Sequence, residues 1–366
     1  MHFSPLLTPG WRAYTCIPQA QEWCQRAGSL ECHFLCGFGF TETALIPGIS
    51  AAGATPAHRR RTALADAEVL LQGYSPHLPT SPDGYPSPVV ISRAVLQHFG
   101  IPLHLFDCGL PATLPSLIPA IPAIAKCLST GGAMRVEQVQ QRFELGLAWG
   151  SRLAQSNRIL VMGECVAGGT STALAVLLGL GYPVAGMVNS SHPTCNHSQK
   201  LELVRQGLRQ VLPDSSGIEI LAAVGDPMQP LLAGLALAAS QQGAVLLAGG
   251  TQMLAVYALV DRLAQEQGLD WDPDQVVVGT TRWVAEDPTG NSVGLAHLVG
   301  KVPLLACQLS FAHSRYPQLQ AYERGYVKEG VGAGGLALMA NLKQWDPVEM
   351  VAAIEGIYQS LVGNQV

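Results

Sequence analysis

Short apolar segments alternate along the chain with longer segments of helical periodicity, and this alternation constrains the fold more than any other feature. Several of the short segments are apolar on both faces, notably Arg158–Met162 and Ala244–Leu247. Strands of this kind belong to parallel sheets that are covered by helices on both sides. The sequence therefore predicts an α/β fold with a doubly wound, mostly parallel sheet flanked by helices.

The elements can be assigned from periodicity and from the Gly- and Pro-rich connections between them. The predicted strands are Cys32–Gly37, Val89–Ile91, Leu103–Phe106, Arg158–Met162, Val184–Val188, Ile218–Val224, Ala244–Leu247, Gln275–Val278 and Leu304–Leu309. The predicted helices are Arg135–Gln155, Thr170–Leu180, Ser198–Val211, Gln229–Gln241, Thr251–Gln267 and Pro347–Leu361. Two Pro-rich segments, 74–88 and 109–132, are predicted to be irregular, either as loops over a site or as plain connectors.

Composition excludes several classes of protein. Only 13% of residues are charged and 48% are hydrophobic, which excludes a disordered chain and a coiled coil. The net charge of −5 argues against a nucleic-acid partner, and no apolar segment is long enough for a membrane span. The chain start lacks a secretory pattern, and most of the nine cysteines lie in apolar segments. We therefore expect a cytoplasmic protein with reduced thiols.

Two cysteine patterns have the potential to bind a metal. Cys32 and Cys36 are four residues apart, and His192, Cys195 and His197 lie in one short segment. Neither pattern has a complete set of four ligands nearby in the sequence. We predict no metal site and no cofactor.

The segment Gly163–Thr172 is the strongest candidate for binding chemistry. It follows a predicted strand and opens a predicted helix, where free N–H groups suit a phosphate monoester. The predicted phosphate contacts are Gly168, Gly169, Thr170, Ser171 and Thr172. The alternative is an ordinary glycine turn with a threonine cap. The loop is neither a Walker A motif nor a dinucleotide-binding motif.

Two glutamates stand out against sparsely charged surroundings. Glu164 lies inside the candidate phosphate loop, where a carboxylate would repel a phosphate. It therefore either has a separate role, such as binding ribose hydroxyls, or is an ordinary surface glutamate. Glu329 lies among small and apolar residues just before an Ala/Leu/Met helix. Partial burial raises the pKa of such a carboxyl, which suits a general base. The alternative for Glu329 is a helix-capping residue in a Gly-rich turn.

Taken together, these segments resemble the nicotinate-nucleotide–dimethylbenzimidazole phosphoribosyltransferase family of cobalamin assembly. Gly163–Thr172 resembles the family's Gly-Glu-Met-Gly-x-Gly-Asn-Thr-Thr loop, and Lys328–Ala333 resembles its late Gly-Glu-Gly-x-Gly-Ala stretch. Lys200 matches a family lysine, and Ala248–Met253 resembles the family's Asp-Gly-Phe stretch. The segment Thr41–Pro56 is similar to an N-terminal signature of the archaeal and cyanobacterial branch.

The resemblance implies both an architecture and a reaction. It implies an α/β domain over residues 30–335, with a smaller helical part from residues 1–29 and 336–366, and a homodimer. The implied reaction moves phosphoribosyl from nicotinate mononucleotide to dimethylbenzimidazole or a related azole or purine. Glu329 would be the base that accepts the azole proton, and Glu164 would hold the ribose or the developing positive charge. Lys200 would contact the phosphate or the nicotinate carboxylate, unless it faces solvent. We also expect substrate contacts from Gly249, Gly250, Gly330 and Gly332.

The sequence also departs from the family pattern. Val166 stands where the family has glycine, Gly169 stands where it has asparagine, and no lower-base pocket is recognisable. A non-catalytic nucleotide-binding relative and another ribose-phosphate enzyme therefore remain alternatives. In the Thr41–Pro56 segment, turn capping is slightly favoured over pocket lining. The basic run Arg59–Arg61 is predicted to be a solvated helix start.

Overall fold

A computed structural model describes residues 10–363 of the chain. It is built on one eight-stranded sheet with the order β1-β8-β7-β6-β5-β2-β3-β4. Neighbouring strands are parallel except for the β1–β8 pair, which is antiparallel. The strands are β1 Trp11–Ala13, β2 Glu31–Phe40, β3 Leu103–Gly109, β4 Ile118–Pro119, β5 Arg158–Ala167, β6 Ala244–Ala248, β7 Val276–Thr281 and β8 Leu304–Cys307.

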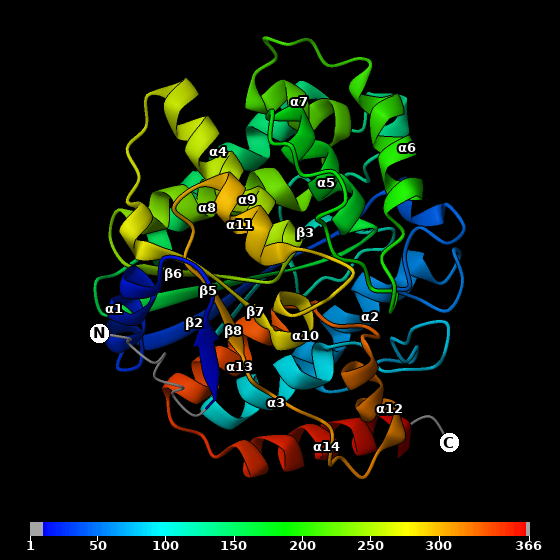
Figure 1. Cartoon of the computed structure of the whole chain (residues 1–366), viewed down its shortest axis with the longest axis vertical. Coiled ribbons are helices and arrows are strands. Elements are labelled where there is room, and N and C mark those ends of the chain that lie inside the picture. Colours follow the sequence, from blue (N-terminus) through cyan, green and yellow to red (C-terminus); the bar gives the residue numbers. More distant parts are fainter. Residues whose placement is uncertain (1–9, 364–366) are drawn as a thin grey trace.

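Helices cover both faces of this sheet, so the predicted doubly wound α/β fold is confirmed (Figure 1). One face packs against α4 Val136–Leu153, α5 Gly169–Gly179, α6 His197–Leu208, α7 Gly217–Val224, α8 Met228–Ser240, α9 Thr251–Gln267 and α11 Ser292–Val299. The other packs against α1 Ile17–Ala27, α2 Arg59–Gln72, α3 Val89–Phe99, α10 Arg282–Ala285, α12 Pro317–Gln320, α13 Ala333–Leu342 and α14 Pro347–Gly363. Short 3₁₀ helices are η1 Glu42–Leu45, η2 Leu128–Thr130, η3 Pro273–Gln275 and η4 Ala321–Arg324.

The two faces of β5 and β6 explain why these strands are apolar throughout. Side chains of Leu160 and Met162 belong to one core cluster, whereas those of Ile159 and Val161 belong to the other. Over the first of these faces, every residue of α8 is buried. A Cβ atom at Gly146 of α4 would overlap the α8 backbone, so glycine is what permits the close approach of α4 and α8.

Three of the predicted strands are wrong. Val89–Ile91 begins helix α3, and Ile218–Val224 belongs to helix α7, which a capping box of Ser216 and Glu219 starts. Short apolar segments fit a buried helix as well as a buried strand, so periodicity did not separate them. Val184–Val188 forms no regular element, although both valines are buried and anchor the loop after α5.

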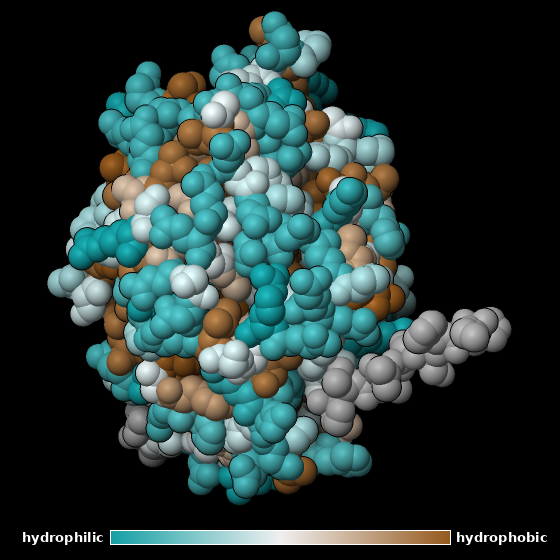
Figure 2. Space-filling model, turned by 90° about the vertical axis from the view of Figure 1, so that its left-hand side faces the viewer, coloured by the Kyte–Doolittle hydropathy of each residue, from teal (hydrophilic) through white to brown (hydrophobic). Residues whose placement is uncertain are grey.

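The other predicted strands, the six helices and the irregular segment 74–88 are confirmed within a few residues. The segment 109–132 is mostly irregular, and it adds the edge strand β4. At the chain ends, β1 joins the sheet beside β8 and α14 packs on α3. Within residues 10–363, no helix is long and apolar enough to cross a membrane. One face of the molecule is largely hydrophilic with scattered hydrophobic residues (Figure 2).

The order of the strands indicates where a ligand can bind. The chain runs outward from β2 to β3 and β4, and then returns to place β5 on the other side of β2. Ligands of open α/β sheets bind at such a switch point, outside the carboxyl ends of the strands. The loops that follow β2, β5, β6 and β7 surround this point.

Candidate active site

A cavity open to solvent lies at the carboxyl ends of the strands around the switch point. Glu164, near the end of β5, and Glu329, in the loop before α13, both line it. Their two segments are joined directly, because the amide of Val331 donates a hydrogen bond to the carbonyl of Glu164 at 2.9 Å. The structure therefore brings together two glutamates that lie far apart in the sequence.

Four hydrogen bonds hold the carboxylate of Glu329. The Thr280 hydroxyl and the Thr281 amide donate to Oε2 at 2.9 and 3.0 Å, and the amides of Gly330 and Gly334 donate to Oε1 at 3.1 and 3.0 Å. Burial raises the pKa of Glu329 above its usual value, and these four donors oppose that rise. The carboxylate is therefore fixed in one orientation at the cavity wall.

The backbone that carries Glu329 is strained. Val327, Lys328 and Val331 all have left-handed φ angles, of 66°, 63° and 56°. Such conformations cost a non-glycine residue about 1–3 kcal/mol each and persist only where the surroundings enforce them. Here the Thr281 hydroxyl donates to the carbonyl of Lys328, and Ser92 donates to the carbonyl of Val331. This arrangement is typical of a functional loop.

Glu164 is held much less tightly. Its Oε2 accepts one hydrogen bond, from the amide of Val166 at 3.0 Å. Burial raises the pKa of Glu164 to about 8, and the nearby carboxyl of Asp226 contributes to the rise. Asp226 is fully buried, and its Oδ2 accepts hydrogen bonds from Thr172 and Gln252 at 2.6 and 2.7 Å. The proton of Glu164 is therefore exchanged close to neutral pH.

This raised pKa predicts how stability depends on pH. The folded protein binds the Glu164 proton up to about pH 8, whereas an unfolded glutamate loses it near pH 4.5. Stability contributed at this site is therefore present at low pH and falls as pH rises between these values, by at most about 1.4 kcal/mol per pH unit. Relative to wild type, E164Q is expected to gain stability from about pH 5.5 to about pH 8.5 in urea unfolding. If the difference in unfolding free energy between E164Q and wild type stays the same across this pH range, the pKa of Glu164 is not raised.

The N-terminus of α5 reaches the cavity, but only part of the predicted phosphate loop does. Gly168, Gly169 and Thr170 line the cavity. Ser171 and Thr172 do not belong to its lining; both are fully buried, and Thr172 is bonded to Asp226. One side of the first turn of α5 therefore faces the cavity, and the other side faces the protein core.

The other predicted contacts divide in the same way. Gly250 and Gly330 line the cavity, whereas Gly249 and Gly332 do not. Lys200 is also outside the lining, and the solvent-facing alternative for it is wrong because it is fully buried. Its Nζ donates to the carbonyl of Asn189 at 2.6 Å, and burial lowers its pKa to about 7. Lys200 therefore supports the cavity wall through Asn189.

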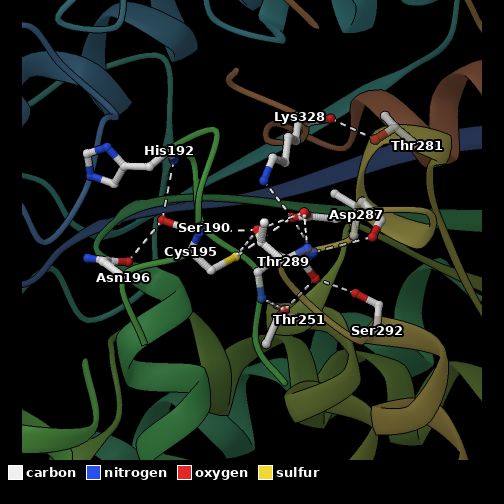
Figure 3. A network of polar contacts seen from close by, with 12 residues as sticks. Ser190, His192, Cys195, Asn196, Thr251, Thr281, Asp287, Thr289, Ser292 and Lys328 are labelled. Carbon is white, nitrogen blue, oxygen red and sulfur yellow. Dashed lines mark hydrogen bonds and ion pairs between the residues drawn. The ribbon is translucent and has the colours of Figure 1, made fainter. Parts of the chain in front are cut away.

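Sequence reasoning missed a second lysine that does line the cavity. Lys328 is 2% exposed, and its Nζ lies 2.5 Å from Oδ2 of Asp287. Figure 3 shows this pair within a network that ties the cavity wall to the loops after β6 and β7. Asp66 of α2, buried and also on the cavity wall, was missed as well; burial raises its pKa to about 7. Lys328 opens the segment Lys328–Ala333, but at a position where the family motif has glycine, and Asp66 lies in no motif. Their places on the cavity wall are therefore seen only in the tertiary structure.

The remaining predictions concern segments around the cavity. Thr41 caps η1 as expected, whereas Ser50 lies on the cavity wall. Arg59 is not solvated: it is buried and donates to the carbonyls of Ala44 and Ile46, which fixes the segment after β2. The Pro-rich segment 74–88 is a loop over the site, since Pro79, Thr80, Ser81, Ser87 and Pro88 line the cavity.

The histidines of the 192–197 segment have structural partners. His192 is bonded to the carbonyl of Gly48, and His197 to the carbonyl of Thr289. Within residues 10–363, no group of three or more His, Cys, Asp or Glu side chains is placed to hold a metal ion. The thiols of this part of the chain are all free.

The structure is an α/β fold with two carboxyl groups facing a cavity at the carboxyl ends of its strands. Known proteins with this fold include phosphoribosyltransferases. A family model described as phosphoribosyltransferase matches residues 92–271. The fold is similar to that of nicotinate-nucleotide-dimethylbenzimidazole phosphoribosyltransferase from Thermus thermophilus, with a TM-score of 0.60 and 16% identity over 92% of this chain and 90% of that chain.

Curated relatives narrow the assignment. The UPF0284 protein of Gloeobacter violaceus is 58% identical, covering 92% of this chain and 90% of that relative. The UPF0284 protein of Cyanothece is 54% identical, covering 94% and 96%. The chain therefore belongs to the UPF0284 family. The match of residues 92–271 to the phosphoribosyltransferase model agrees with the resemblance found in the sequence.

Proposed function

We propose that this protein transfers the phosphoribosyl group of nicotinate mononucleotide to a ring nitrogen of an aromatic base. Dimethylbenzimidazole and related azoles or purines are the acceptor class, and the product serves in assembly of the cobalamin nucleotide loop. The observation that carries the proposal is the convergence of Glu164 and Glu329 on one cavity beside the N-terminus of α5. Membership of a phosphoribosyltransferase family and the fold similarity support it.

The chemistry of the donor matches the residues of the cavity. In nicotinate mononucleotide the bond from the anomeric carbon to the pyridinium nitrogen breaks, and its electron pair leaves with neutral-ring nicotinate. A ring nitrogen of the acceptor forms the new bond to the anomeric carbon. The acceptor then carries an excess proton on its other ring nitrogen, which a base must accept. The positive charge that develops on the ribose favours a nearby carboxylate.

Each glutamate suits one of these roles. We assign the base to Glu329, because the Thr280 hydroxyl is the one rotatable donor among its four partners. When that hydroxyl turns away, Oε2 gains a free lone pair for the incoming proton while the other three hydrogen bonds still hold the carboxylate. We assign Glu164 to the ribose, because its single hydrogen bond leaves it free to bind hydroxyl groups. Its ionised form, whose share grows as the pH approaches its pKa of about 8, faces the developing charge.

The test is a transfer assay with the purified protein. Nicotinate mononucleotide is incubated with dimethylbenzimidazole, with adenine and with other azoles, and nicotinate and the ribotide phosphate are followed by chromatography and mass spectrometry. We expect nicotinate release that requires an acceptor and matches ribotide formation one to one. Tight nucleotide binding without release for any acceptor would instead favour the non-catalytic relative. Equal binding of ribose 5-phosphate and no effect of the nicotinate ring would favour another ribose-phosphate enzyme.

A further inference from the structure

The side chains that line the cavity include more carboxyl groups than ammonium groups, which opposes the binding of an anionic substrate. Among the described residues that line the cavity, Asp66, Glu164 and Glu329 carry carboxyl groups, and Lys328 is the one cationic side chain. A nucleotide monophosphate brings a further two negative charges at most. Removing a phosphate from water is costly unless a charged partner and hydrogen bonds replace the lost hydration. The position of Lys328 therefore determines where such a group can lie.

The ammonium group of Lys328 has unused hydrogen-bonding capacity. Its side chain is 2% exposed, and Asp287 is its only hydrogen-bond partner in the described part of the chain. An ammonium carries three N–H donors, so two remain available for a ligand. Because Lys328 is almost completely buried, hydrogen bonds from its ammonium to an anionic ligand would be charge-assisted and stronger than bonds between neutral groups.

Asp287 fixes the direction in which this ammonium points. Its Oδ2 also accepts a hydrogen bond from Nδ2 of Asn189 at 3.0 Å, and its Oδ1 accepts from the amide and hydroxyl of Thr289 at 2.9 and 2.8 Å. Lys328 and Asp287 thus form a buried pair that belongs to a larger polar network (Figure 3). A pair held in this way presents one geometry to a ligand instead of sampling many rotamers.

Neutral polar groups and no second cationic side chain accompany Lys328 among the described residues of the cavity lining. Asn189, Ser190, Ser191 and Thr251 line the same cavity, and Asn189 shares Asp287 with Lys328. Lys328 stands where the family pattern that this segment resembles has glycine. Hydroxyl groups around one ammonium suit the tetrahedral oxygens of a phosphate monoester better than a flat carboxylate.

We infer that Lys328 is the cationic contact for the phosphate monoester of the nucleotide donor, and that Asp287 is its positioning residue. The inference rests on the proposed function for the identity of the donor, but not for the binding of its phosphate. Lys200 then supports the site from behind Asn189 and makes no contact with the nucleotide.

Calorimetric titration tests this with three ligands at one pH and salt concentration. Nicotinate mononucleotide has both acidic groups, nicotinamide mononucleotide lacks the ring carboxylate, and nicotinate riboside lacks the phosphate. We expect K328M to weaken binding of both mononucleotides by at least about 10–100-fold and to leave binding of the riboside unchanged, since at least one charge-assisted hydrogen bond is lost. The matched control is K301M, which changes an exposed lysine outside the cavity.

A second variant protects the test against misfolding. K328M leaves Asp287 buried without its partner, whereas K328M/D287N removes both charges together. The double variant is expected to fold and to show the same selective loss of both mononucleotides. Unchanged mononucleotide affinity in the double variant would overturn the inference. A loss confined to nicotinate mononucleotide would overturn it too, by assigning Lys328 to the ring carboxylate.

The binding results are separable from the fate of the proposed function. Lys328-dependent phosphate binding without nicotinate release would leave the inference standing and reject the transferase. Transfer activity in the wild-type protein, together with wild-type affinity of K328M/D287N for the mononucleotides, would support the transferase and overturn the inference. If the wild-type protein binds no mononucleotide, titration with inorganic phosphate decides the matter, and the absence of Lys328-dependent phosphate binding would overturn the inference.

Discussion

Replacing Glu329 with glutamine is expected to lower the rate of transfer by about 10²–10⁴-fold, the usual contribution of a positioned general base. The amide cannot accept the acceptor's proton. It also turns an NH₂ group towards the N–H groups of Thr281 or Gly334, which now donate to the carboxylate. The rate of nicotinate release in single turnover measures this effect directly.

Two further variants give this result its meaning. T280V removes one hydrogen bond from Oε2 but keeps the carboxylate, so it should cost far less activity than E329Q. E349Q makes the same atomic change at an exposed residue of α14 and should have no effect. A Glu329→Gln protein that melts like wild type and retains wild-type turnover would show that another group accepts the proton.

A single methyl group at Gly334 should be almost as damaging. A Cβ atom there would overlap the backbone of Thr280 and Thr281 and the carboxylate of Glu329. Because backbone atoms cannot move aside cheaply, G334A must shift the start of α13 or displace Glu329. We expect turnover to fall at least about 100-fold, as small misplacements of catalytic groups produce, and stability to fall by about 1–3 kcal/mol.

The matched control for this variant is G356A. Gly356 lies in helix α14, where a Cβ atom would meet nothing within 4 Å. Alanine there should leave turnover unchanged and stabilise the protein by about 0.5–1 kcal/mol, because alanine favours a helix over glycine. Turnover is measured by nicotinate release and stability by thermal unfolding. Equal turnover and equal stability of G334A and G356A would contradict the packing described around Glu329.

Much of the fold was predictable from the sequence because burial on both faces leaves a direct mark on a strand. Arg158–Met162 and Ala244–Leu247 were assigned correctly for this reason. Ile218–Val224 was not, because a buried helix of eight residues is as apolar as a strand and the N-cap of its capping box, Ser216, lies before the segment. For short elements, the local sequence pattern thus predicts the position better than it predicts whether the element is a helix or a strand.

The candidate site was predictable to the extent that it follows strand ends. Glu164 and Glu329 could be placed because each belongs to a Gly-rich segment close to a predicted element. Strand β5 is longer than predicted and runs through Glu164 to Ala167, whereas Glu329 does lie in a loop, before α13. Lys328 and Asp287 could not be paired, since their contact joins two loops that only the packed sheet brings together. Ser171 and Thr172 were predicted to contact a phosphate, but their side chains lie on the side of the first turn of α5 that faces the core. The sequence alone does not show which side of that turn faces the cavity.

The most direct test of the whole account is an experimental structure with nicotinate mononucleotide bound. We expect the nucleotide inside the cavity, with its anomeric carbon between the carboxyl groups of Glu164 and Glu329. Its phosphate should lie against the ammonium of Lys328. A nucleotide bound elsewhere on the sheet edge, or one whose anomeric carbon lies beyond reach of both glutamates, would contradict it.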